Sequence, residues 1–134
     1  MQTRVNDRRR GAAFVELAVV LPLMILLFTL SADYGRVFYF SQVLTECAKD
    51  GALYLSDPRA PANNLYSNVQ DAALSGATDL RPQPTVISTT GHDSAGDPFV
   101  LVTVTWTFRT VTGFPGVPNN TILQRTCQMR QAPQ

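Results

Sequence analysis

The sequence predicts an α+β fold with a long N-terminal helix, a short second helix and a three-stranded antiparallel sheet. Two patterns lead to this prediction. The first 55 residues combine an apolar segment with apolar residues spaced three and four apart, which is the helical period. Residues 100–109 alternate between apolar and polar side chains, which is the strand period, and shorter β-branched segments flank them. The chain of 134 residues is long enough for one domain.

Residues 12–32 form the longest apolar segment and contain one formal charge, Glu16. As a helix, this segment spans about 30 Å, the thickness of the hydrocarbon core of a bilayer. A buried helix in a soluble protein is the alternative, but the rest of the chain is too small to surround it. Four arginines precede the segment and Asp33 follows it. The positive-inside rule therefore predicts a cytoplasmic N-terminus and a C-terminal part on the other side of the membrane.

The helical pattern continues beyond the apolar segment. One helix face carries a stripe of mostly apolar residues, namely Val37, Phe40, Leu44, Cys47, Ala48, Gly51 and Leu55. No strong helix breaker occurs before Pro58, so we expect one helix from about residue 12 to about residue 55. Its first half would be a membrane span, and its second half would be an amphipathic support for the outer domain.

A second helix and the first strand are expected after Pro58. Asn64 is a suitable N-cap for the helix, and Pro82 prevents the helix from continuing. Residues 85–90 are short and β-branched, which indicates a strand. Residues 91–98 are rich in glycine and aspartate and have the composition of a hairpin connection.

The remaining two strands should bury one face of the sheet. In the segment 100–109, the apolar set is Val100, Val102, Val104, Trp106 and Phe108. The third strand, from about residue 121 to 129, has Leu123, Cys127 and Met129 on one side. The helical stripe is the longest available cover for this face. Such packing would bring Cys47 and Cys127 onto facing surfaces, where they either form a disulfide outside the cytoplasm or serve as small apolar side chains.

Charge and residue types argue against several classes of function. After Gly11, nine acidic residues face seven basic ones, so we expect no nucleic-acid partner. His92 is the single histidine, which leaves neither a catalytic triad nor a zinc site. Asp93 and Asp97 offer oxygen ligands of the kind calcium prefers, but their spacing matches no established calcium loop. We therefore predict no enzyme activity, no cofactor and no metal.

Glu16 is the most informative residue of the apolar segment. An ionised side chain within a bilayer costs several kcal/mol, so it normally has a function and a partner. If the chain is cut after Gly11, Ala12 acquires a free amine at the membrane face. That amine could pair with Glu16 of a neighbouring subunit and fix the register of packed helices. The alternative is a glutamate near the cytoplasmic interface that extends its carboxylate towards water.

At these residues the sequence resembles a known family. Arg9-Arg10-Gly11 followed by residues 12–16 resembles the class III signal of type IV prepilins, in which a prepilin peptidase cleaves after the glycine and the fifth mature residue is glutamate. Residues 15–23, 33–39 and 44–52 are similar to the TadE-like pseudopilins of the tight-adherence (Tad/Flp) pilus system. Departures occur at Leu17, where the family often has an aromatic residue, and at Leu53, where it often has arginine.

The resemblance implies a type IV pilin-like fold and a role for each residue of the signal. Gly11 and Ala12 would flank the cleaved bond, Glu16 would be the assembly glutamate, and the leader arginines Arg8, Arg9 and Arg10 would stay in the cytoplasm. It implies a minor pseudopilin that helps to initiate or cap a pilus used in adhesion and biofilm formation. The implied partners are the prepilin peptidase, the Flp pilin, TadF-like subunits and the pilus assembly platform.

The expected organisation follows from these assignments. Residues 1–11 would be a basic prepilin leader, residues 12–33 the span in the bacterial inner membrane, and residues 34–134 a periplasmic or extracellular pilin-like domain. The alternative function is that of an uncleaved, single-pass membrane protein whose outer domain binds a ligand or an envelope partner. The sequence does not distinguish a TadE-like chain from its TadF and TadG relatives.

Overall fold

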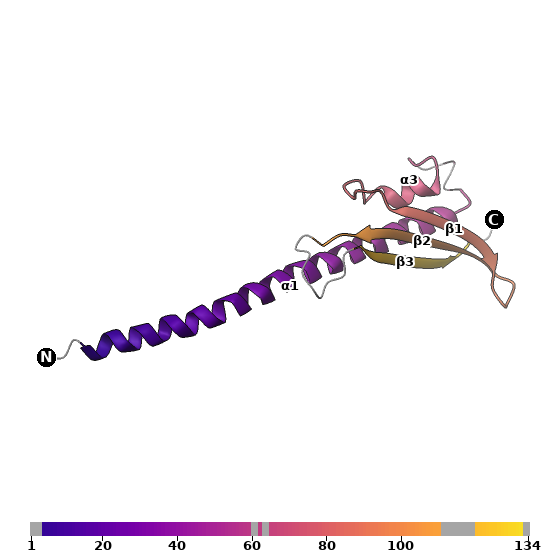
Figure 1. Ribbon diagram of the computed structural model, residues 1–134. Helices are drawn as coiled ribbons and strands as arrows, with labels where there is room; N and C mark the ends of the chain where they lie inside the picture. The colour runs from indigo at the N-terminus through magenta and orange to yellow at the C-terminus, as the bar shows by residue number, and fades with distance from the viewer. Residues whose placement is uncertain (1–3, 60–61, 63–64, 111–119, 133–134) are drawn as a thin grey trace.

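A computed structural model describes residues 4–59, 62, 65–110 and 120–132, with side chains from Gly11 onwards. The elements are α1 (Arg4–Ser56), α3 (Val69–Leu74), β1 (Thr85–His92), β2 (Pro98–Phe108) and β3 (Thr121–Arg130). This confirms the predicted arrangement of a long helix, a short helix and a three-stranded antiparallel sheet. Figure 1 shows that the sheet covers only the C-terminal half of α1, whereas the N-terminal half projects away from it.

The long helix begins earlier than expected, at Arg4 instead of about residue 12. Residues 4–11 contain no proline, the strongest helix breaker, and four of the eight are arginine, a good helix former. Pro22 lies inside α1. Proline cannot donate the backbone hydrogen bond of its turn, but a membrane-spanning helix tolerates it.

The sheet has the order β1-β2-β3, and both pairs are antiparallel. Val102 of β2 lies opposite Ser88 of β1 and Cys127 of β3. The even-numbered side chains of β2 are buried from Val100 to Phe108, as the alternation predicts. The odd-numbered side chains between them are half-buried, so only one face of the sheet is covered.

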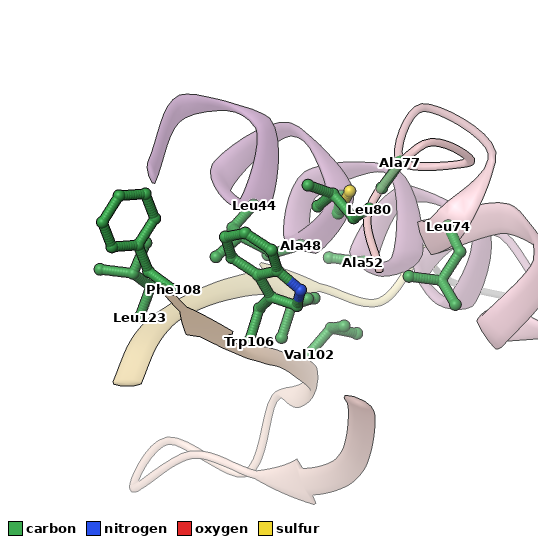
Figure 2. Close-up of a cluster of buried hydrophobic side chains, with 12 residues drawn as sticks. Leu44, Ala48, Ala52, Leu74, Ala77, Leu80, Val102, Trp106, Phe108 and Leu123 are labelled. Carbon is green, nitrogen blue, oxygen red and sulfur yellow. The ribbon is translucent and has the colours of Figure 1, made fainter. Parts of the chain in front are cut away.

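The second half of α1 covers that face. Its stripe from Val37 to Leu55 belongs to the hydrophobic core, as predicted. In Figure 2, side chains of α1 lie over those of Val102, Trp106 and Phe108. Gly51 permits a close approach, because a Cβ atom there would lie 3.0 Å from both the Cβ of Ala73 and a methyl of Val102. The core therefore joins α1, α3 and the sheet.

The second helix begins later than expected. Its N-cap is Asn68, whose side-chain oxygen accepts a hydrogen bond from the backbone N–H of Asp71 at 2.8 Å. The predicted cap, Asn64, lies outside the described residues. Leu65 is exposed, so the apolar face of α3 starts at Val69 and not four residues earlier.

The β1–β2 turn is built around Asp93. Its carboxylate accepts hydrogen bonds from the backbone N–H groups of Ala95 and Asp97, each at 2.9 Å. Gly96 supplies the positive φ of 85° that this turn requires. Asp97 forms an ion pair with Arg130 at 2.6 Å. Both carboxylates expected to suit calcium are thus engaged by the chain itself.

Candidate functional site

The candidate site is the N-terminal half of α1. From Gly11 onwards, this helix is long and apolar enough to cross a membrane, and none of the residues in its most apolar stretch is buried. Large apolar side chains project from it in all directions; Phe28, for example, is 78% exposed. Soluble monomers rarely expose a continuous apolar surface of this size. A single N-terminal helix of this kind indicates a membrane anchor.

The residues of the predicted cleavage signal lie at the beginning of this exposed half. Gly11 and Ala12 are exposed, and no atom lies within 4 Å of a Cβ built at Gly11. The side chains of Arg8, Arg9 and Arg10 lie outside the part of the chain that the structure describes. The Gly11–Ala12 bond is helical here, so a protease would have to unwind or locally extend this turn.

Glu16 is also exposed, one helical turn after Ala12 and on the same side of the helix. Within the described residues, neither a hydrogen bond nor an ion pair joins Glu16 to another side chain. The carboxylate is therefore available to a partner outside the chain.

The two cysteines lie where the predicted packing puts them. Cys47 of α1 is buried, and Cys127 of β3 is half-buried against the same core. Both thiols are free in this structure. Burial raises the pKa of the Cys47 thiol above its ordinary value of 9.0, and the nearby carboxylate of Asp50 adds to the increase. Their pairing stays a prediction.

Sequence reasoning missed a polar contact where the apolar segment ends. Asp33 is 1% exposed, and its Oδ1 lies 3.7 Å from Nη1 of Arg36. The guanidinium of Arg36 also lies over the rings of Phe40 and Phe108, 5.8 and 5.4 Å from their centroids. The i, i+3 spacing of Asp33 and Arg36 is the signal that could have predicted the ion pair.

His92 and Trp106, the single histidine and the single tryptophan of the chain, lie in the sheet. His92 is exposed at the end of β1, and Trp106 belongs to the core, where its Nε1–H donates to the carbonyl oxygen of Pro82 at 2.7 Å. No group of three or more histidine, cysteine, aspartate or glutamate side chains suited to a metal occurs among the described residues.

Comparison with known families now adds to this geometry. Residues 11–53 match the TadE-like protein family. The matched segment begins at Gly11 and ends on the buried half of α1, so it includes the exposed apolar segment, Glu16 and most of the core stripe. A search of the curated proteins and a search of the solved structures gave no match. The match confirms the resemblance over these residues, and the TadE-like family is a structural family related to Tad pilus systems.

Proposed function

We propose that this protein is a minor pseudopilin that helps to initiate or cap a Tad/Flp pilus used in adhesion and biofilm formation. The observation that supports this most strongly is the exposed Glu16 carboxylate on an otherwise apolar, exposed helix, one turn after the Gly11–Ala12 bond. A solitary carboxylate in hydrocarbon is costly, so a partner in a neighbouring subunit would give it a reason to be there.

The proposed life cycle has two stages. The chain first enters the bacterial inner membrane with residues 1–11 in the cytoplasm, residues 12–33 across the bilayer and residues 34–134 in the periplasm. Prepilin peptidase then removes the leader after Gly11. The assembly platform transfers the mature chain into the pilus, where the exposed half of α1 packs against Flp pilin and TadF-like subunits instead of lipid.

The mature N-terminus tests processing. N-terminal sequencing and intact mass of the protein extracted from membranes should find a chain that begins at Ala12. A chain that still begins at Met1 in a host with an active prepilin peptidase would contradict processing and favour the uncleaved, ligand-binding membrane protein. Gly11→Leu should block cleavage, whereas the exposed glycine variant Gly35→Ala should be processed normally.

Glu16→Ala tests assembly separately. We expect normal cleavage and membrane insertion but a loss of pili, because the N-terminal amine of the neighbouring subunit would lose its partner. Glu46→Ala is the matched control, since Glu46 is an exposed glutamate on the same helix and forms an ion pair with Lys49 at 2.8 Å. An unchanged number of pili in Glu16→Ala would indicate that the glutamate merely extends towards the cytoplasmic interface.

A further inference from the structure

The first turns of α1 beyond the proposed span lie at the level of lipid headgroups. Because an α-helix rises about 1.5 Å per residue, Arg36 lies about 4.5 Å beyond Asp33 and Phe40 about 10 Å beyond it. Tyr34, Phe38 and Tyr39 are each about 60% exposed or more at this level. Exposed aromatic side chains in such a position are typical of a membrane interface.

The outer domain presents a cavity at the same level. The cavity has a volume of about 250 Å³ and lies between α1, the segment that precedes β1, and the C-terminal end of β2. Its lining includes Arg36, Arg81 and Arg109, together with Asp79 and Trp106. Three arginines from three separate parts of the chain therefore meet beside the proposed membrane surface.

The three guanidinium groups are held in different ways. Arg36 rests against Phe40 and Phe108, and its side chain is 41% exposed. Nη1 of Arg81 donates to the carbonyl oxygens of Thr78 and Leu80, at 3.0 and 3.3 Å, which fixes its position. Arg81 and Arg109 are both exposed. Neighbouring groups thus hold Arg36 and Arg81 in place, and the exposed Arg109 completes the set of cations around a space large enough for a phosphate group.

The charges of the outer domain are distributed unevenly along α1. Near the membrane, Arg36, Arg81 and Arg109 face two carboxylates, those of Asp33 and Asp79. At the far end, six acidic residues outnumber the three basic residues Lys49, Arg59 and Arg130; the acidic ones are Glu46, Asp50, Asp57, Asp71, Asp93 and Asp97. The far end thus has the charge that an anionic membrane repels, and the near end the charge that it attracts.

From this arrangement we infer that the cavity between Arg36, Arg81 and Arg109 binds the phosphate of an anionic phospholipid headgroup. The site would hold the outer domain against the membrane until the chain leaves the bilayer. This inference rests on the anchoring role proposed for α1. Charge complementarity and the position of the cavity beside the end of the span favour a lipid over a soluble anion.

Trp106 lines the cavity and is the single tryptophan of the chain, so its fluorescence reports on this site. The full chain would be reconstituted in phosphatidylcholine vesicles containing equal, small fractions of either doxyl-labelled phosphatidylglycerol or doxyl-labelled phosphatidylcholine. We expect the anionic lipid to be enriched about fivefold at Trp106, the effect of the one positive charge that remains when Asp33 and Asp79 oppose two of the three arginines. Arg81→Gln with Arg109→Gln leaves Arg36 alone against Asp33 and Asp79, so it should abolish the enrichment and bring the ratio to one or below.

The control is Arg59→Gln with Arg130→Gln, which removes the same charge at the far end of the domain and should keep the enrichment. Equal quenching by both lipids in the unaltered chain would overturn the inference. So would a control variant that loses as much of the enrichment as Arg81→Gln with Arg109→Gln. So would inorganic phosphate that displaces the labelled lipid at millimolar concentration, since it would indicate a site for soluble anions. Flotation of every variant with the vesicles tests the anchor itself; a chain that floats without lipid preference contradicts this site alone, and a chain that does not float contradicts both.

Discussion

The two halves of α1 share one continuous helix but differ in what surrounds them. Phe28 in the first half is 78% exposed, whereas Leu44 in the second half is completely buried by the sheet. Apolar content alone does not predict burial within the chain, because both halves are rich in apolar residues. The arrangement of those residues matters more: they surround the first half and form a stripe on the second. The first half must find its partner in lipid or in other helices.

The comparison is tested most directly by removing a phenylalanine side chain from the buried core and another from the exposed half of α1. Phe108→Ala should lower the free energy of unfolding of the outer domain by about 3–5 kcal/mol, because Phe108 is fully buried against α1. Phe28→Ala should leave it unchanged. Denaturant unfolding of both variants in the same detergent checks the difference, and an equal loss in the two would contradict it.

The cysteines test how firmly the second half of α1 is held against β3. In protein from an oxidising compartment, we expect Cys47 and Cys127 to be linked, which would raise the free energy of unfolding by about 2–4 kcal/mol. Reduction should then increase the intact mass by two hydrogens. A mass that reduction does not change, with two thiols open to alkylation after unfolding, would show that they are buried apolar side chains instead.

Gly51 and Gly35 allow two effects of a glycine-to-alanine substitution to be measured separately. One is the higher helix propensity of alanine, and the other is the space available for its Cβ atom. Gly51→Ala should destabilise the domain by about 1–3 kcal/mol, because the new Cβ would meet Ala73 and Val102 at 3.0 Å. Gly35→Ala meets no atom within 4 Å and should stabilise the helix by about 0.5–1 kcal/mol. Thermal unfolding of the two variants should therefore shift in opposite directions, and shifts of the same sign would contradict the close approach at Gly51.

The smallest expected effect concerns Asp50, at the end of the helix far from the membrane. Partial burial raises the pKa of its carboxyl above the ordinary value of 3.8, and the nearby Glu46 raises it further. A raised pKa means that the folded state prefers the protonated form, so stability decreases as the pH rises through this range. Asp50→Asn should slightly raise the unfolding midpoint at neutral pH and lose this advantage below about pH 3.8. A benefit that is independent of pH would contradict the charge as its cause.

Much of the fold could be predicted because its signals are local. The stripe on α1 and the alternation of β2 have periods that secondary structure imposes directly, and both faces are buried as expected. The boundaries were less predictable. Asn64 and Asn68 are equally suitable caps by residue type, and the packing of Val69 and Ala72 against Tyr54 and Tyr66 selects the later one. The start of α1 was missed because no residue marks it.

The candidate site also has features that the sequence predicts and features that only the tertiary structure shows. The sequence by itself indicated the apolar span and the unusual position of Glu16 within it, because membrane thickness and the cost of a buried charge act on a single contiguous segment. Cleavage after Gly11 stays a prediction. Only the tertiary structure decided that Gly51 touches Val102 and that Arg36, Arg81 and Arg109 share one cavity. Those residues are far apart in the chain, and no local period relates them. Their proximity depends on the path of the chain between α1 and β2, which the packing of the whole core determines.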